Sequence, residues 1–309
     1  MKKALLFSGQ GSQYVGMMSS LYENYDLAKS MLNKADEILG YELSKICFDG
    51  PIEVLKETRY TQPAIFLHSA IVFELLKDKV TFDATAGHSV GEYAALFAAG
   101  VLSFEDALKL VSKRGQLMFG AGEVLPGTMF AVINLADDKL ENLCNELSEI
   151  GKPEVIVPAN YNSPGQIVIS GSAEYLRANA HKFKEAGARM VTELIVSGAF
   201  HSPLMEPAKQ ELEIAINGIN FNDANVPVYS NVYAKPLVSS EDIKSALIAQ
   251  LTSPVKWSQS LIQMKDDGFT SFTELGPGNV LQGLVKRTLT EVEIFGCDKA
   301  EDLQKFSAI

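Results

Sequence analysis

The five residues Gly87-His88-Ser89-Val90-Gly91 limit the possible fold more than any other segment of the chain. They follow a short run typical of a buried strand, Phe82–Ala86, and precede a helical pattern that ends near Gly100. Because glycine has no Cβ atom, the two glycines permit a sharp turn that holds Ser89 at the strand end. The free N–H groups of the helix point at the same place and stabilise a developing negative charge there. The pattern predicts a nucleophile elbow; a plain strand–turn–helix joint with an exposed serine is the alternative.

Strand and helix patterns alternate on both sides of this turn. The further strand candidates are Ala4–Phe7, Val226–Asn231, Phe269–Glu274 and Val292–Cys297. The helix candidates are Leu21–Leu39, Pro63–Leu76 with proline in its first turn, and a helix that begins after Ser103. This alternation is typical of an α/β fold with a largely parallel sheet. Together with the elbow it predicts an α/β-hydrolase-like core.

The middle of the chain follows a different order. Its strand candidates are Met129–Leu135, Val155–Ala159, Gln166–Ser170 and Arg189–Val196, and its helix candidates are Asp137–Leu147 and Ala173–Ala186. The order β-α-β-β-α-β is that of a ferredoxin-like unit. We therefore expect a core made of residues 1–127 and 198–309, with a ferredoxin-like subdomain, residues 128–197, inserted in it.

Composition excludes several classes of protein. The 309 residues are 47% hydrophobic, which is enough for a large core, and carry a formal net charge of −11. The acidic balance disfavours nucleic-acid binding, which needs clustered Lys and Arg. Three widely separated cysteines disfavour a disulfide framework or a zinc site. The cysteine count fits a reducing, cytoplasmic setting, and we expect no metal. No apolar run reaches the length of a secretory signal or a membrane span, so we expect no membrane association.

A serine nucleophile needs a base, and the chain offers four histidines. His68 lies in an apolar helical run and is expected to pack in the core, whereas His181 lies on a polar helix face. His88 is adjacent to Ser89 and is expected to point away from it. His201 lies in a loop where the chain returns to the core, and such loops often carry catalytic groups. Elimination favours His201.

Arg114 lies on the apolar stripe of its helix, between Val111 and Met118. Arginine is almost never buried without a partner. Either Arg114 pairs with an internal carboxylate, or it faces a cavity and binds an anion. A guanidinium group matches a carboxylate in bidentate geometry. The residues alone leave both interpretations open.

Two glycine-rich turns carry weaker signals. The segment Ser8–Gln13 follows the first strand, but Tyr14 occupies the third glycine position of a dinucleotide-binding frame, so an unliganded turn is the default. Gly276-Pro277-Gly278-Asn279 joins a strand to a helix and is taken as a structural turn.

Six motifs occur in order along the chain: GQGSQ at 9–13, TQPA at 61–64, GHSVGE at 87–92, KRG at 113–115, GAFHSPLM at 198–205 and SPVKW at 253–257. Together they resemble the malonyl-CoA:acyl-carrier-protein transacylases of bacterial fatty-acid synthesis. The acyltransferase domains of polyketide synthases share the pattern and form the near alternative. The resemblance covers nearly the whole chain, and Val90 stands where leucine is commoner.

The resemblance implies a role for each matching residue. Ser89 would be acylated and His201 would be its base, with the backbone carbonyl of Gln250 orienting the histidine. The backbone N–H groups of Gln10 and Val90 would form the oxyanion hole. Arg114 would bind the malonyl carboxylate. The residues expected to line the pocket are Asn162, Phe200 and His88.

The same resemblance implies substrates and partners. The expected reaction moves a malonyl group from a coenzyme A thioester to acyl carrier protein by a ping-pong route, with no cofactor and with the enzyme as a monomer. Because carrier proteins of this type are acidic, docking needs a basic patch. Arg189, Lys286 and Arg287 are the candidates.

Two other functions compete with this interpretation. A serine esterase would need an acid between nucleophile and base in chain order, and Asp137 and Asp138 are available. An inactive acyl-binding or carrier-docking module would form no covalent adduct.

Overall fold

The larger of two sheets in the computed structural model, which describes residues 2–306, has six strands in the order β10-β9-β1-β2-β7-β8. Neighbouring strands run parallel except β8, which runs antiparallel to β7. The strands are β1 (Lys2–Phe7), β2 (Ala84–Gly87), β7 (Val228–Tyr229), β8 (Pro236–Leu237), β9 (Phe269–Leu275) and β10 (Glu293–Cys297). The predicted α/β core with a largely parallel sheet is confirmed.

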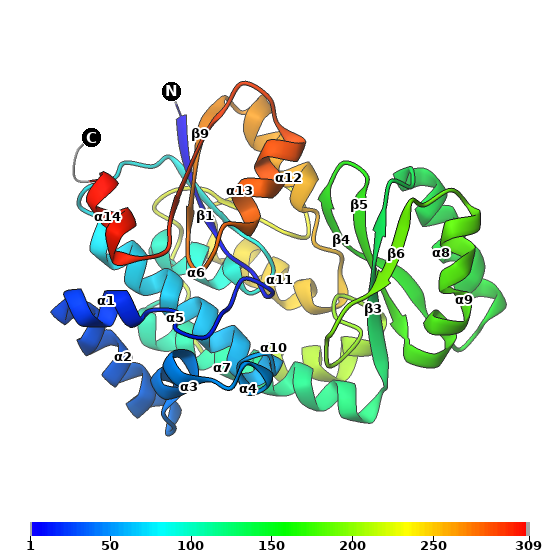
Figure 1. The fold of residues 1–309 in the computed structure, drawn as a ribbon, viewed down its shortest axis with the longest axis horizontal. Helices are drawn as coiled ribbons and strands as arrows, with labels where there is room; N and C mark the ends of the chain where they lie inside the picture. Colours follow the sequence, from blue (N-terminus) through cyan, green and yellow to red (C-terminus); the bar gives the residue numbers. More distant parts are fainter. Residues whose placement is uncertain (1, 307–309) are drawn as a thin grey trace.

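Helices cover both faces of this sheet (Figure 1). Alternate residues of a strand point to opposite faces. Accordingly Leu5 and Phe7 pack in the large cluster with α5 (Thr58–Leu76) and α6 (Gly91–Ala98). Ala4 and Leu6 belong to a second cluster with α12 (Trp257–Asp266) and α13 (Val280–Thr288). Burial on both faces explains the uninterrupted apolar run of β1.

The other core helices surround this centre. They are α1 (Ser19–Asn24), α2 (Asp26–Leu39), α3 (Leu43–Asp49), α4 (Ile52–Leu55), α7 (Phe104–Val124), α10 (Glu206–Asn217), α11 (Ser240–Ala249) and α14 (Ala300–Phe306), with 3₁₀ turns at Pro203–Met205 and Gln250–Thr252. Within residues 2–306, none of the helices has both the length and the apolarity needed to cross a bilayer.

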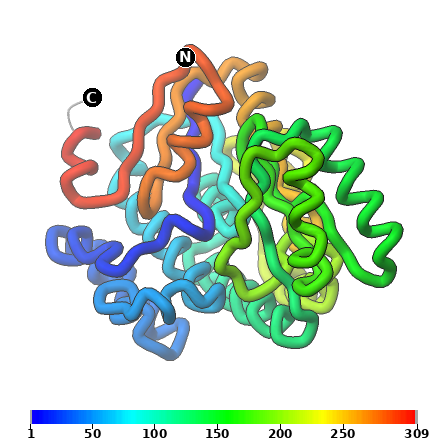
Figure 2. Tube along the Cα trace, turned by 45° about the vertical axis from the view of Figure 1, so that its right-hand side comes forward, coloured from blue at the N-terminus to red at the C-terminus, as the bar shows by residue number. Residues whose placement is uncertain are grey.

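A second, antiparallel sheet forms the inserted subdomain, shown in green in Figures 1 and 2. Its elements are β3 (Gly127–Ile133), α8 (Asp137–Ile150), β4 (Ile156–Ser163), β5 (Gln166–Ser172), α9 (Ala173–Glu185) and β6 (Met190–Glu193). The strand order is β4-β5-β3-β6. The predicted β-α-β-β-α-β unit is confirmed, whereas the domain boundaries at 127/128 and 197/198 stay predictions.

Backbone hydrogen bonds join the inserted sheet to the core. The Tyr161 N–H donates to the Val255 carbonyl at 2.8 Å, and the Val255 N–H donates to the Ala159 carbonyl at 2.8 Å. This short parallel pairing ties β4 to the segment just before α12. The pairing therefore holds the inserted sheet in a fixed position beside the core.

Two expected helices differ from those observed. The segment Leu21–Leu39 is two helices, because Tyr25 has extended backbone angles (φ −133°, ψ 121°) that end α1 and start α2. The helix expected to begin at Pro63 begins at Thr58. Pro63 therefore lies inside α5, where it cannot donate a hydrogen bond to the preceding turn. Dense packing outweighs this loss, because every residue from Thr61 to Phe73 is buried.

Candidate active site

Ser89 lies in the turn between β2 and α6 with a left-handed backbone, φ +52°. The flanking glycines are sterically required. A Cβ on Gly87 would lie 2.0 Å from the Gly91 carbonyl carbon, and one on Gly91 would lie 2.2 Å from the Phe7 carbonyl oxygen. The left-handed geometry is unusual for a residue with a side chain and is typical of strained functional sites. The nucleophile elbow predicted from the sequence has this local geometry.

Asn231, two residues after the end of the neighbouring strand β7, holds this turn. Its Oδ1 accepts a hydrogen bond from the Ser89 N–H at 2.7 Å, and its Nδ2 donates to the Gly87 carbonyl at 2.7 Å. One buried carboxamide therefore bridges the two sides of the strained turn. Sequence reasoning missed Asn231, although a polar residue at the carboxyl end of a core strand is a recognisable signal.

The hydroxyl of Ser89 meets the imidazole of His201. Ser89 Oγ lies 2.8 Å from His201 Nε2, and His201 Nδ1 lies 2.9 Å from the carbonyl oxygen of Gln250. A carbonyl only accepts hydrogen bonds, so Nδ1 carries the proton and Nε2 is left to accept from the serine. Burial and the nearby Arg114 charge lower the pKa of His201 to about 3. The imidazole is therefore a neutral base at ordinary pH.

Arg114, on α7, is 1% exposed and is held by three acceptors. Nη1 donates to Gln62 Oε1 at 2.6 Å, and Nη2 donates to Gln250 Oε1 at 2.9 Å and to Ser89 Oγ at 3.0 Å. Its Nε has no partner. Among residues 2–306, no carboxylate oxygen lies within 4.0 Å of the guanidinium. The internal ion pair that was one of the two interpretations is absent there.

Gln250 and Glu92 extend this buried hydrogen-bond network behind Ser89, His201 and Arg114. Gln250 Nε2 donates to Glu92 Oε2 at 2.6 Å, and the same Glu92 oxygen accepts from the Asn231 N–H at 3.3 Å. Sequence reasoning gave Gln250 a role through its backbone alone and did not single out Glu92 or Gln62. An acid followed by Tyr93-Ala94-Ala95-Leu96 in an apolar helix is the signal that would have drawn attention to Glu92.

These groups open onto a cavity of about 170 Å³ between the two sheets. Val90, Met118, Met129, Val168, Leu194, Val196 and Phe200 give it an apolar wall, and Gln10, His88, Asn160 and Asn162 give it polar groups. His88 Nε2 lies 2.8 Å from Asn162 Oδ1, and the His88 ring packs against Trp257 at 5.5 Å. All three expected pocket residues, together with Gln10 and Val90, therefore line one space with Ser89.

The remaining histidines lie elsewhere. His68 is fully buried, with Nε2 2.7 Å from the Asp298 carbonyl oxygen, and His181 is exposed on α9. The serine-esterase alternative placed its acid at Asp137 or Asp138, which open α8 in the inserted subdomain. The Nδ1 of His201, where such an acid would bind, faces the Gln250 carbonyl instead.

The basic residues expected to dock a carrier lie near a surface hollow of about 420 Å³. Arg189 and Arg287 both line it, although one belongs to the inserted subdomain and the other to α13. Arg287 Nη1 donates to Gln166 Oε1 across the hollow at 2.8 Å. Lys286 is exposed beside Arg287 but does not line it.

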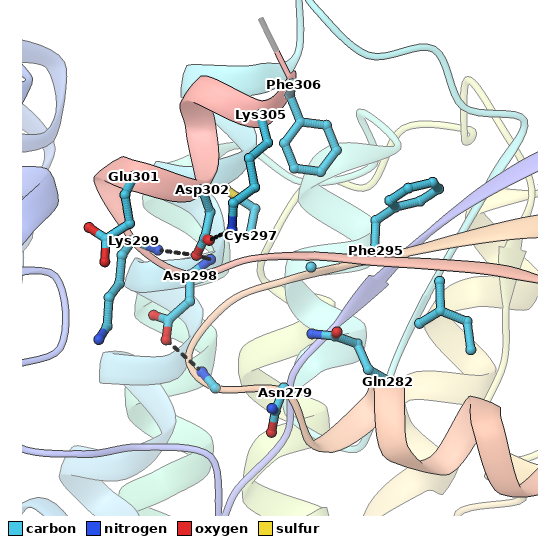
Figure 3. Close-up of a pocket in the computed structure, with 13 residues that line it drawn as sticks. Asn279, Gln282, Phe295, Cys297, Asp298, Lys299, Glu301, Asp302, Lys305 and Phe306 are labelled. Carbon is cyan, nitrogen blue, oxygen red and sulfur yellow. Dashed lines mark hydrogen bonds and ion pairs between the residues drawn. The ribbon is translucent and has the colours of Figure 1, made fainter. Parts of the chain in front are cut away.

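A larger cavity of about 730 Å³ lies at the far edge of the core sheet, between β10, α13 and α14 (Figure 3). The turn Gly276-Pro277-Gly278-Asn279 borders it, and Asp298 accepts from the Gly278 N–H at 3.1 Å. Two of its acids are engaged locally, since Asp298 holds this turn and Asp302 forms an ion pair with Lys305. None of the residues singled out for catalysis lines this cavity, so size alone does not identify the candidate active site.

Comparison with known proteins gives consistent matches. The family model of the acyl transferase domain matches residues 4–306. A malonyl CoA-acyl carrier protein transacylase of Bacillus subtilis is 42% identical over 304 residues, covering 98% of this chain and 95% of that protein. One from Staphylococcus aureus is also 42% identical, covering 98% and 97%.

Solved structures show the same similarity. An acyl carrier protein S-malonyltransferase from Vibrio cholerae superposes with a TM-score of 0.93 at 39% identity, covering 99% of each chain. A malonyl-transacylase solved in complex with its type II polyketide synthase acyl-carrier protein gives a TM-score of 0.93 at 35% identity, again covering 99% of each chain.

Proposed function

The chain belongs to the acyl transferase domain family, and on that premise we propose that it transfers the malonyl group of malonyl-CoA to the phosphopantetheine thiol of an acyl carrier protein in fatty-acid synthesis. The two relatives that cover 98% of its length carry the name malonyl CoA-acyl carrier protein transacylase. The observation that carries the proposal is the buried Arg114 guanidinium, 3.0 Å from the Ser89 hydroxyl and held by carboxamides rather than by an acid.

The first half-reaction acylates the enzyme. Ser89 Oγ attacks the thioester carbonyl carbon while His201 Nε2, 2.8 Å away, takes the hydroxyl proton. The carbon–sulfur bond then breaks, and the proton passes from His201 to the departing coenzyme A sulfur. The product is a malonyl ester on Ser89.

The second half-reaction reverses these steps with a new thiol. The carrier's phosphopantetheine thiol gives its proton to His201 and attacks the ester carbonyl, and Ser89 Oγ leaves and regains the proton. The Gln250 carbonyl at Nδ1 keeps the imidazole in the same tautomer for both halves. Each step is assigned to groups of this chain, with no cofactor in the scheme.

The tetrahedral intermediates carry a negative oxygen, which we assign to the backbone N–H groups of Gln10 and Val90. Val90 begins the first turn of α6, where the helix dipole favours negative charge. Gln10 is anchored from another element, since its Oε1 accepts a hydrogen bond from Thr58 Oγ1 at 2.8 Å. One such donor contributes on the order of 10²–10³ in rate.

Arg114 selects the acyl group. A malonyl ester on Ser89 places its free carboxylate two bonds from the ester carbonyl, beside the guanidinium fork that contacts Ser89 in the free enzyme. The carboxylate forms a bidentate, charge-assisted pair with Arg114. An acetyl group leaves the buried cation without a charged partner, which is costly.

We assign carrier docking to Arg189 and Arg287, with Lys286 beside them. The hollow that the two arginines line includes Ser163 at the end of β4, and Asn162, the preceding residue of that strand, lines the active-site cavity. On this proposal the prosthetic arm of a carrier held at the hollow extends from this end of β4 to Ser89. We expect the enzyme to act as a monomer in the cytoplasm.

The decisive experiment is intact-mass analysis after mixing the protein with malonyl-CoA. The wild type is expected to gain one malonyl unit, Ser89→Ala none, and added carrier protein is expected to remove the adduct. A wild type that gains no malonyl unit, or that releases malonate without transferring it to the carrier, would contradict the proposal. Release without transfer is the behaviour of an esterase.

A further inference from the structure

Glu92 is a buried acid to which the reaction above assigns no role. It is the second residue of α6, lies directly under the elbow and is 3% exposed. Burial raises its pKa to about 7. Within residues 2–306, no Lys, Arg or His nitrogen lies within 4.0 Å of its carboxylate. Burying an acid is unfavourable without hydrogen-bonding partners, so its contacts indicate what it does.

Its partners are donors from residues that contact the reacting groups. Glu92 Oε2 accepts from Gln250 Nε2 at 2.6 Å and from the Asn231 N–H at 3.3 Å. Gln250 in turn contacts Arg114 through its side chain and His201 through its backbone. Glu92 Oε2 is therefore linked through Gln250 to His201 and Arg114. It is linked through Asn231 to the turn that carries Ser89.

The contact with Glu92 fixes the direction of the Gln250 carboxamide. A carboxamide has one accepting and one donating end. Because the Glu92 oxygen accepts, Gln250 Nε2 must face it, and Oε1 then faces Arg114 Nη2 at 2.9 Å. A rotated amide would oppose oxygen to oxygen at Glu92 and N–H to N–H at Arg114. Both contacts therefore require the observed orientation.

A carboxamide in this position has an electrostatic consequence. A carboxylate placed directly on Arg114 would orient the guanidinium but also neutralise it and occupy its fork. Gln250 and Gln62 hold Nη2 and Nη1 with neutral oxygens instead. The positive charge of Arg114 therefore remains available for an incoming acyl carboxylate. Glu92, which orients Gln250, lies beyond ion-pair distance from the guanidinium.

We propose that Glu92 is a positioning residue for acyl-group selection: by orienting the Gln250 carboxamide it keeps the Arg114 fork directed at the malonyl carboxylate. This inference rests on the proposed malonyl transfer and assigns to it a residue that contacts neither substrate nor base. It acts on the preference for malonyl over acetyl. The contact with Asn231 affects the elbow, and hence both acyl groups alike, so the ratio of the two rates separates the roles.

The test measures kcat/KM for acylation of Ser89 by malonyl-CoA and by acetyl-CoA. Glu92→Met removes the accepting oxygen and is expected to lower the malonyl/acetyl ratio by about tenfold or more, whereas Glu92→Gln keeps an accepting oxygen and is expected to stay within about threefold of the wild type. Glu274→Met is the matched control. Glu274 is another buried acid, 1% exposed, that accepts from the backbone of α13. The Glu274→Met variant is expected to lose stability but to keep the wild-type malonyl/acetyl ratio.

A second variant guards against misfolding of Glu92→Met. Gln250→Met keeps the backbone carbonyl that His201 uses but removes the carboxamide, so it is expected to lower the ratio in the same way. The inference is overturned if Glu92→Met or Gln250→Met keeps the wild-type ratio, or if Glu92→Gln loses it as fully as Glu92→Met. Failure of the wild type to form a malonyl adduct would instead overturn the proposed function.

Discussion

Arg114 Nη2 lies 3.0 Å from Ser89 Oγ, on the same hydroxyl that His201 Nε2 approaches to 2.8 Å. The base and the cation therefore meet at one oxygen atom. In the free enzyme the hydroxyl serves as a partner for the arginine. Once the oxygen is esterified, the arginine needs another acceptor close by. A short acyl group that ends in a carboxylate supplies one inside the cavity that Ser89 and Arg114 line.

Removing the cation should reverse the acyl preference. We expect Arg114→Ala to lower the rate of malonyl adduct formation roughly 10²-fold, because a charge-assisted bidentate contact is lost. The rate with acetyl-CoA should stay the same or rise, because no buried charge is left unpaired. Arg114→Lys keeps the positive charge but lacks the two-pronged guanidinium, so its rate of malonyl adduct formation should lie between those of the wild type and Arg114→Ala. Stopped-flow release of coenzyme A measures both rates; equal losses for the two acyl groups would show that Arg114 does not select.

The left-handed backbone at Ser89 should lower the free energy of unfolding of any variant that has a side chain at this position. With φ at +52°, any side chain at this position is strained, whereas glycine is not. We expect Ser89→Gly to be about 1 kcal/mol more stable than Ser89→Ala, since the two variants lack the same hydroxyl and differ in the Cβ atom. Urea denaturation of the two variants measures the difference. Equal midpoints would mean that the turn relaxes once the hydroxyl is gone.

The low pKa of His201 predicts how the protein responds to acid. Burial, followed by the Arg114 charge, lowers this pKa from 6.5 to about 3. Between these two values the unfolded chain holds a proton at residue 201 that the folded chain does not. The contribution of His201 to the free energy of unfolding is therefore complete above pH 6.5 and declines as the pH falls toward 3. The acylation rate should show no inflection near pH 6.5, because the folded base is already neutral there.

A variant without the imidazole isolates this effect. His201→Phe should lose less stability than the wild type between pH 7 and pH 4.5, as measured by urea denaturation at each pH. Parallel losses in the two proteins would show that His201 titrates normally in the folded state. An acid limb near pH 6.5 in the rate of acylation would lead to the same conclusion if it persists in Glu92→Gln, because the pKa of Glu92 is itself raised to about 7.

Sequence patterns predicted what depends on local chemistry. The apolar run of β1, the glycines of the elbow and the β-α-β-β-α-β order are visible because each restricts the backbone or buries a whole segment. The break at Tyr25 was missed because the apolar periodicity of α1 and α2 continues across it. Pro63 suggested a helix start, although packing of α5 on both sides tolerates it inside the helix.

The polar partners behind the site were harder to predict. Whether Arg114 faces an acid or carboxamides depends on α5 and the turn at Gln250, which approach it only in the folded chain. The position of Asn231 after a core strand is a signal that a polar group is needed there, but neither Asn231 nor Gln62 shows by its residue type which group it contacts. The proximity of Arg189 and Arg287 also arises from the way the inserted sheet lies beside α13, which the residues in isolation do not reveal.

Docking of the carrier gives the last prediction. Reversing Arg189, Lys286 and Arg287 to glutamate should lower kcat/KM for transfer to an acidic carrier by about tenfold or more, because a complementary patch becomes repulsive. Acylation by malonyl-CoA should be unaffected, because none of the three lines the active-site cavity. The matched control reverses Lys29, Lys34 and Lys45, which lie on α2 and α3 and change the net charge equally. Added salt should slow the wild type toward the triple variant. If both triple variants slow transfer alike, overall charge governs the encounter and the assigned patch is wrong.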